Sequence, residues 1–171
     1  MLNLNIEEKL ITTVKHLDAL RVVKKERIPV WITEQVVDKQ ALPTDGCSWT
    51  SFDEPFMLFE QEKYYWFKAS FKVQNVKETE NAFLCIETFI DGVACTIRPQ
   101  GLLYLNGKLI QGVDINHTDI LLKEGKYEMY LLFYTHTFIR ALPVYFSIKH
   151  GQGANKGMCI EKKIHLVFSF F

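Results

Sequence analysis

From Tyr64 onward, hydrophobic and polar residues alternate along the chain in the pattern of half-buried β-strands. In the first of these runs the apolar residues Tyr65, Phe67 and Val73 share one side, and Lys68 and Lys72 share the other. Later runs of the same character are Phe83–Ile90, Ala94–Ile97, Leu102–Leu105, Leu109–Gln111, Asp119–Leu122, Tyr127–Thr135 and Leu142–Ile148. Short strands separated by turn residues predict a mostly β fold, an antiparallel β-sandwich or jelly roll over residues 29–150.

The strongest turn signal is Asn106-Gly107, which lies between two apolar runs. A two-residue type I′ turn needs positive φ at both central residues, and Asn and Gly adopt that conformation most readily. We therefore expect a β-hairpin over the stretch from Gly101 to His117.

A different periodicity occupies the N-terminal 28 residues. Apolar residues recur there at steps of three and four between Asn5 and Glu26, which predicts one face of a helix. Asn5 can cap this helix, basic residues in its last turn suit the helix dipole, and Pro29 ends it. We interpret residues 1–28 as a helical arm that docks on its own domain, in preference to a membrane-surface or partner-binding helix.

Two segments show no regular period. Between Pro29 and Pro55 the breakers Pro43 and Asp45-Gly46 predict an irregular connection, anchored by Trp31, Trp49 and Phe52. Residues 151–171 form an atypical tail, rich in glycine at first and apolar at its end. Because chain ends are usually polar, we expect this tail to mark a truncated or altered end.

Composition excludes several classes of protein. The 171 residues contain 20 Lys and Arg against 20 Asp and Glu, so no net charge favours nucleic acid or an acidic membrane. The four cysteines, Cys47, Cys85, Cys95 and Cys159, have no metal-site spacing and are expected to be free thiols. No segment has the features of a secretion signal or the roughly 18 uninterrupted apolar residues of a membrane span. The expected location is the cytoplasm, and the sequon at Asn116 is a chance match.

Candidate chemistry gathers in the turn after the hairpin, where Asp114, Asn116, His117 and Asp119 lie close in sequence. A polar turn whose Asp and Asn side chains bind their own backbone explains these residues most simply. The alternatives are a divalent-cation site made by Asp114, Asn116 and Asp119, and contact with a sugar or a neighbouring domain. His117 and His136 are interpreted as structural, since no HExxH sequence or nucleophile elbow accompanies them.

Aromatic side chains offer a second kind of candidate. Trp49, Phe52, Tyr64, Tyr65 and Trp66 have the rings that stack on sugars, although core packing is the expected role of most of them. Glu60 and Glu62 flank the start of the aromatic strand, and a paired-carboxylate hydrolase would need two such groups across a cleft. No phosphate loop or dinucleotide motif is present in the sequence.

Two stretches carry a resemblance to a known family. They are Tyr65-Trp66-Phe67-Lys68-Ala69-Ser70-Phe71 and the run from Arg98 to His117, which contains GLLYLNG and QGVDINH. Both resemble the N-terminal domain of glycoside hydrolase family 38 α-mannosidases, over most of the chain from Asn5 to Ile148. The resemblance implies an accessory sandwich similar to galactose-binding-like jelly rolls, packed beside a separate catalytic domain. That family's zinc ion and catalytic residues lie downstream of the matched region, so none is carried over to this chain.

Three hypotheses follow from the sequence. The first is a non-catalytic accessory domain of an α-mannosidase-like glycoside hydrolase, whose partners are the downstream catalytic domain or neighbouring subunits. The second is a stand-alone carbohydrate-binding module. The third, and weakest, is a small hydrolase that uses Glu60 or Asp114. We expect no cofactor or catalytic residue in this chain, and the candidate contacts with carbohydrate or a neighbouring domain are Trp66, Asp114, Asn116 and His117.

Overall fold

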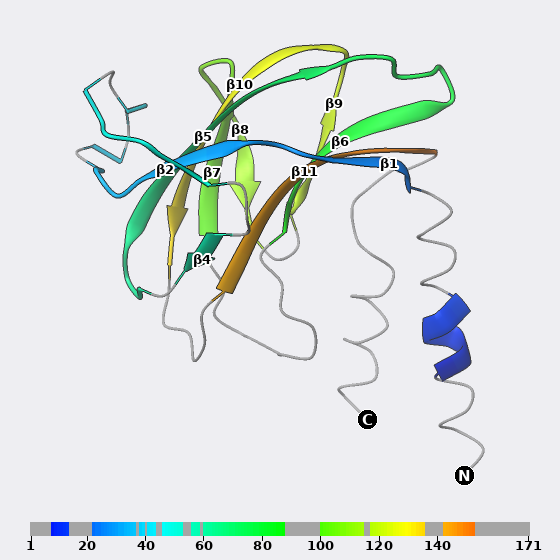
Figure 1. Cartoon of the computed structure of the whole chain (residues 1–171), viewed down its shortest axis with the longest axis horizontal. Helices are drawn as coiled ribbons and strands as arrows, with labels where there is room; N and C mark the ends of the chain where they lie inside the picture. The colour runs from blue at the N-terminus through cyan, green and yellow to red at the C-terminus, as the bar shows by residue number, and fades with distance from the viewer. Residues whose placement is uncertain are drawn as a thin grey trace.

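Strands dominate the residues that the computed structural model describes, which are 8–13, 22–36, 38–39, 41–43, 46–52, 56–58, 60–87, 100–114, 117–135 and 142–152. In chain order the strands are β1 (Val22–Arg27), β2 (Val30–Thr33), β3 (Thr50–Phe52), β4 (Phe56–Leu58), β5 (Tyr64–Val73), β6 (Glu80–Glu87), β7 (Gln100–Leu105), β8 (Lys108–Val113), β9 (Asp119–Leu122), β10 (Gly125–Tyr134) and β11 (Leu142–Gln152). Figure 1 shows them as two layers.

The strands form two antiparallel sheets. One has the order β3-β2-β5-β10-β7-β8, and the other has the order β1-β11-β6-β9, with β4 also paired to β11. The chain passes between the layers repeatedly, since β5, β7, β8 and β10 belong to the first sheet and β6, β9 and β11 to the second. The predicted antiparallel β-sandwich is confirmed.

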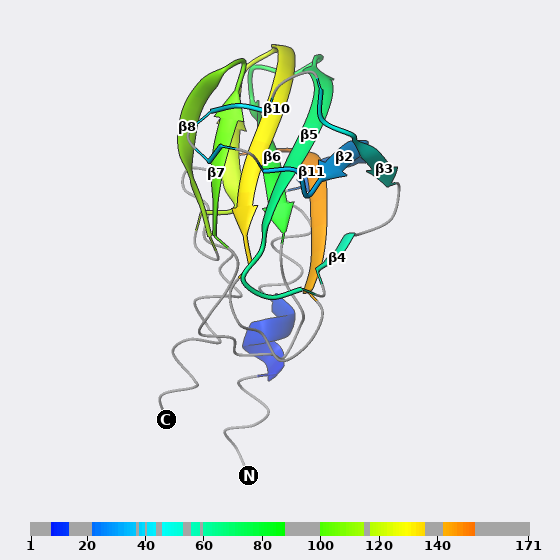
Figure 2. The same ribbon diagram turned by 90° about the vertical axis from the view of Figure 1, so that its left-hand side faces the viewer.

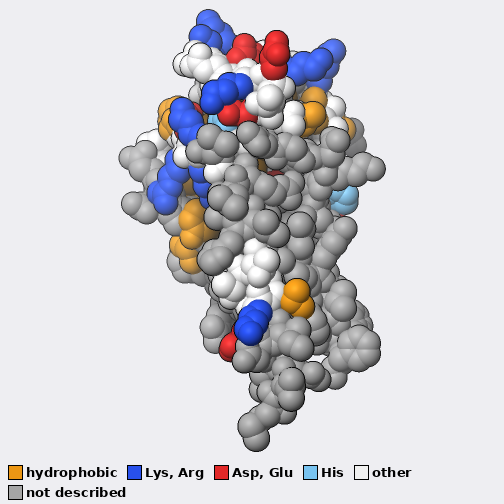
Figure 3. Space-filling view, turned by 90° about the vertical axis from the view of Figure 1, so that its right-hand side faces the viewer, with side chains coloured by type: hydrophobic (Ala, Val, Ile, Leu, Met, Phe, Trp, Pro, Cys, Tyr) orange, Lys and Arg blue, Asp and Glu red, His pale blue; other side chains and the backbone are white. Residues whose placement is uncertain are grey.

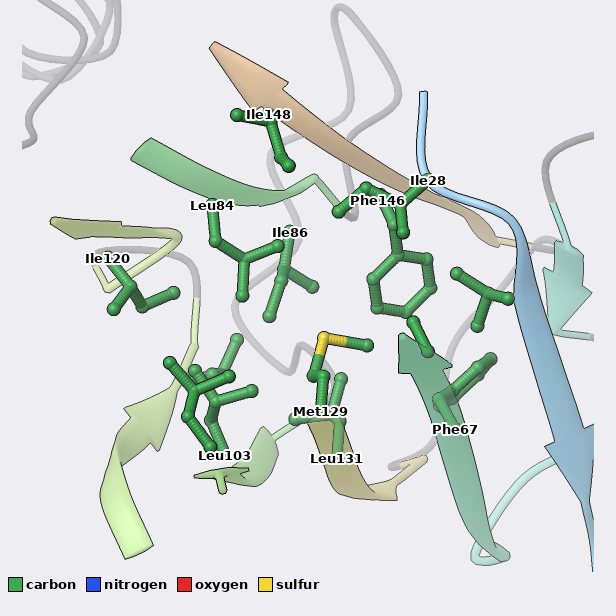
Figure 4. Close-up of a cluster of buried hydrophobic side chains, with 14 of the residues drawn as sticks. Ile28, Phe67, Leu84, Ile86, Leu103, Ile120, Met129, Leu131, Phe146 and Ile148 are labelled. Carbon is green, nitrogen blue, oxygen red and sulfur yellow. The ribbon is translucent and has the colours of Figure 1, made fainter. Parts of the chain in front are cut away.

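The core lies between the two sheets. Figure 4 shows Phe67, Leu103, Met129 and Leu131 of the six-stranded sheet pointing toward residues of the other sheet, such as Ile86. Phe67 is fully buried and contacts rings from both layers, with its centroid 5.9 Å from Phe133 and 5.3 Å from Phe146. Burying large aromatic and branched side chains is the main stabilising contribution of such a sandwich.

The strand and turn predictions from Tyr64 onward are confirmed where the structure describes the residues. Tyr65, Phe67, Ala69 and Val73 face the core as the alternation predicts. Asn106 and Gly107 have φ values of 50° and 77°, as a type I′ turn requires, and they join β7 to β8. The predicted strand at Ala94–Ile97 lies outside the described residues, as do the last three residues of Phe83–Ile90.

The helix prediction is wrong for Val22–Glu26. This segment belongs to β1, which pairs with β11 from Val22 opposite Gly151 to Arg27 opposite Ser147. Its sequence, VVKKER, ends in four good helix formers, but pairing satisfies the backbone groups along an otherwise open edge of β11, and tertiary contacts override local propensity. Residues 8–13 are helical as expected, while 14–21 lie outside the described residues.

The irregular connection between Pro29 and Pro55 also contains strands that the sequence did not reveal. Val30 and Ile32 are buried, and β2 pairs with both β3 and β5. Each of these strands has only three or four residues, which is too short for a period of two to stand out. The sequence does not predict β4 either, because this strand has only three residues.

At the C-terminal end, Gly151 and Gln152 continue β11, so these two residues of the predicted tail belong to a sheet. Residues 153–171 lie outside the described residues. No helix of the described ranges has the length and apolar character needed to cross a membrane.

Candidate functional site

The turn after β8 contains three of the four predicted contact residues. Oδ1 of Asp114 accepts a hydrogen bond of 2.9 Å from the backbone N–H of His117 and lies 2.9 Å from its Nδ1. The same N–H also donates to the backbone carbonyl of Asp114 at 3.2 Å. An Asp side chain that binds nearby backbone stabilises a turn, so the predicted polar turn is confirmed for Asp114. Asn116 lies outside the described residues.

His117 presents its ring to solvent, with 65% of the side chain exposed. The contact with Asp114 fixes the ring through Nδ1, which leaves Nε2 as the atom that can meet a ligand or a neighbouring protein. This geometry supports the predicted structural role of His117 in the turn. His136 lies outside the described residues.

Trp66, the fourth predicted contact residue, is buried on the outward side of the six-stranded sheet. It is only 1% exposed, and its ring lies 5.9 Å from Tyr104 and 6.5 Å from Tyr130. β5 and β8 are three strand spacings apart in the sheet, or about 14 Å, so the structure does not bring Trp66 to the Asp114 turn. Trp66 packs within the protein and offers no free face to a sugar ring.

The segment between β2 and β3 explains why an outward-facing tryptophan is buried. Lys39 Nζ lies 3.8 Å from the ring centroid of Tyr64, and the Trp49 ring lies between Lys68 and Tyr130. In Figure 2 the described pieces of this segment cross in front of the sheet. Of the other predicted stacking residues, Tyr65 is buried and Phe52 packs against the core, as the packing interpretation expects.

Beyond this covered area, the β7–β8 hairpin exposes apolar side chains. Leu109 pairs with Tyr104, whereas Gln111 pairs with Leu103, so Ile110 is the extra residue of a β-bulge. Leu109 and Ile110 consequently both reach solvent, with 56% and 45% of their surfaces exposed. Together with Leu102, which is 39% exposed, they form a surface that we call the hairpin patch.

The candidate carboxylates do not make a paired site. Glu60 forms an ion pair with Lys63. The hydrogen bond between these two side chains is the largest of the effects that raise the pKa of Lys63. Glu60 precedes β5 and Asp114 follows β8, strands about 14 Å apart, whereas glycosidase carboxyl groups lie roughly 5 to 9.5 Å apart. Among the described residues there is also no group of three or more His, Cys, Asp or Glu side chains that could hold a metal ion.

An ion-pair cluster on the outer face of the second sheet was not predicted. Glu87 of β6 binds Lys25 of β1 and Lys149 of β11. Burial by itself would raise the pKa of Glu87, but the hydrogen bonds and charges of the two lysines outweigh it and lower that pKa overall. The three residues are far apart in sequence, so only the pairing of β1, β11 and β6 could reveal them. Figure 3 shows that charged side chains of both signs also gather at one end of the molecule.

Two of the predicted free cysteines are confirmed, Cys47 and Cys85, while Cys95 and Cys159 lie outside the described residues. Cys85 is fully buried, and burial, assisted by the charge of Asp119, raises the pKa of its thiol far above the usual range. A thiol that stays protonated is a poor nucleophile. Cys85 is therefore a packing residue.

Comparison with known proteins gives no match, either to a model of a protein family or to a curated protein.

Proposed function

We propose that this chain is a non-catalytic accessory domain of an α-mannosidase-like glycoside hydrolase, and that it docks on the catalytic domain through the hairpin patch. The single observation that carries the docking role is the exposure of Leu102, Leu109 and Ile110 beside one another on an edge hairpin. Exposed neighbouring apolar residues on a sheet often mark contact with another protein. The hairpin also contains most of the sequence on which the family resemblance rests.

The architecture is consistent with this proposal. Strands that alternate between two antiparallel sheets are what a jelly roll of the galactose-binding-like kind requires. The proposal assigns zinc and the reacting groups to the catalytic domain, and it places the whole protein in the cytoplasm. Full burial of an exposed apolar side chain is worth about 1.5 to 3 kcal/mol. Because these three side chains are already about half buried, docking would gain roughly half of that for each.

A binding experiment tests the docking surface. The probe is a family 38 α-mannosidase expressed without its N-terminal domain, immobilised for interferometry against this chain. We expect saturable binding that weakens at least tenfold when Leu109→Ser and Ile110→Ser are combined. Leu121→Ser is the matched control, because Leu121 is 62% exposed but belongs to β9 in the other sheet. Equal affinity of the hairpin variant and the unmodified chain would contradict the proposal.

A second measurement tests the non-catalytic assignment. The purified chain, mixed with an aryl α-mannoside and zinc, is expected to release no phenol above the rate of the buffer. Zinc-dependent turnover by the chain alone would overturn the assignment, whatever the outcome of the docking experiment.

A stand-alone carbohydrate-binding module is the second candidate, favoured by the exposed ring of His117, which Asp114 holds in the turn after β8. The polar atoms of such a turn can contact sugar hydroxyl groups. Calorimetric titration with mannose oligosaccharides decides this alternative. Heat that saturates at millimolar sugar and disappears in the His117→Ala variant would support it, and the absence of heat would count against it.

A further inference from the structure

A shallow hollow of about 500 Å³, widely open to solvent, lies beside the β7–β8 turn, and nothing in the proposed docking role uses it. It arises from a difference in strand length, because β5 and β10 have ten residues each while β7 and β8 have six. The ladder between β10 and β7 ends at Met129 opposite Leu105. The longer strands therefore project past the hairpin and leave a step in the sheet surface.

Asn106 makes the wall of this step rigid. Its Oδ1 accepts a hydrogen bond of 2.8 Å from the N–H of Glu128, and its Nδ2 donates to the carbonyl of Lys126 at 3.3 Å. On the opposite, core-facing side of the same two strands, the rings of Phe71 and Tyr127 stack at 5.5 Å with an interplanar angle of 22°. The strands beneath the hollow and its wall at Asn106 are thus held in place by other contacts.

Two lysines line the hollow from neighbouring strands. Lys72 of β5 and Lys126 of β10 are directly opposite in the register, where like charges repel. Neither takes part in an ion pair within the part of the chain that the structure describes. Side chains at directly opposed positions begin about 5 Å apart, so both ammonium groups can reach one anion. Lysine binds phosphate and carboxylate through such charge-assisted hydrogen bonds.

Glu128 and Ser70, the next opposed pair, also line the hollow and add polar groups of another kind. Oε1 of Glu128 accepts a hydrogen bond from the Tyr130 hydroxyl at 3.1 Å. The other lone pairs of this carboxylate can accept from hydroxyl groups, but they would repel a bare anion. A ligand that satisfies both sets of groups carries an acidic group next to several hydroxyl groups.

We infer that this hollow binds the anionic group of a sugar phosphate or a sugar acid between Lys72 and Lys126, with sugar hydroxyl groups donating to Glu128. Its volume is in the range of small-molecule sites, roughly 300 to 1,000 Å³, but the hollow is widely open and leaves much of a ligand in solvent, which suits millimolar affinity. The hollow shares no residue with the hairpin patch.

The test is a titration of the ¹⁵N-labelled full chain followed by NMR. The probes are glucose 6-phosphate, glucuronate, inorganic phosphate and, as the neutral control, glucose. We expect glucose 6-phosphate or glucuronate to shift amide signals around the hollow and to saturate at millimolar concentration. A response to only one of the two would tell whether the site takes phosphate or carboxylate. Glucose alone should leave these signals unchanged.

Variants make the test specific to this site. The double variant Lys72→Met with Lys126→Met should weaken the binding at least tenfold, while Lys108→Met, at an exposed lysine in β8, should not change it. Removal of two opposed positive charges is not expected to lower the thermal midpoint, which serves as the folding control. Glu128→Gln should weaken the binding of the acidic sugar but strengthen the binding of inorganic phosphate.

Two outcomes would overturn the inference. One is that neither acidic sugar binds better than glucose, and the other is that the double lysine variant binds as tightly as the unmodified chain. Inorganic phosphate that binds as tightly as glucose 6-phosphate would overturn the role assigned to Glu128.

Discussion

Replacement of Gly101 by alanine tests how closely the hairpin packs on β10. A Cβ atom at this position would lie 2.7 Å from Cδ2 of Phe133, 2.8 Å from Cδ1 of Leu131 and 2.9 Å from the backbone oxygen of Leu132. Real Cβ contacts almost never fall below 3.0 Å. Phe133 and Leu131 are fully buried, and the Leu132 carbonyl belongs to the central strand of the sheet, so none of the three can yield freely.

The expected cost follows from this overpacking. Extra atoms in a well-packed core lower the free energy of unfolding by about 1 to 3 kcal/mol. Because one of the three contacts is with a backbone atom, which cannot rotate away, we expect Gly101→Ala to cost about 2 to 3 kcal/mol. For a chain of this length each kcal/mol lowers the thermal midpoint by about 2 to 4 °C, so we expect a fall of roughly 4 to 12 °C. The assay is urea unfolding followed by tryptophan fluorescence. A lower urea midpoint, with no change in the slope of the free energy of unfolding against urea concentration, reports a loss of stability.

Gly112→Ala is the matched control. Gly112 lies on the neighbouring strand β8, and a Cβ atom there would have its nearest contact at an ordinary 3.8 Å. Because glycine inside a strand is entropically unfavourable, this variant should be as stable as the unmodified chain or more stable by up to about 1 kcal/mol. The reasoning is refuted if the free energy of unfolding of Gly101→Ala lies within about 0.5 kcal/mol of that of the unmodified chain. It is also refuted if Gly101→Ala and Gly112→Ala have the same urea midpoint.

Three further predictions concern other parts of the sandwich. At pH 8, iodoacetamide should label Cys47 while Cys85 stays unlabelled until urea unfolds the chain; equal rates would contradict the assigned burial. Glu87→Gln should lower the urea midpoint at pH 7, because a carboxylate whose folded pKa is lowered stabilises the folded chain above its ordinary pKa of 4.5. The difference should shrink as the pH falls from 4.5 through the lowered folded pKa, and a difference that does not shrink at all in acid would refute this. Asn106→Ala should cost about 1 to 3 kcal/mol in urea unfolding, because it removes two hydrogen bonds to β10 at a residue with φ of 50°, and Asn106→Gly should cost less.

Part of the candidate site could be predicted from the sequence because it depends on local interactions. Asp114 binds the backbone of a residue three positions later, and that contact needs only the turn itself. The burial of Trp66 could not be predicted, because an alternating strand places it on the outward side, where it is covered by residues distant in sequence such as Tyr104 and Tyr130. The bulge at Ile110 was hidden for a similar reason, since a bulge is defined by the register between two strands.

By itself the sequence determined where the long strands and the type I′ turn form. A period of two over Tyr64–Val73 and the steric freedom of Asn106-Gly107 act within a few residues, whatever the rest of the chain does. The tertiary structure decided everything that needs a distant partner. It turned Val22–Arg27 into a strand by offering the edge of β11, joined Glu87 to two distant lysines, and created the hollow where long strands pass a short hairpin. Each of these features depends on which strands become neighbours, and the energy of pairing and burial decides that choice.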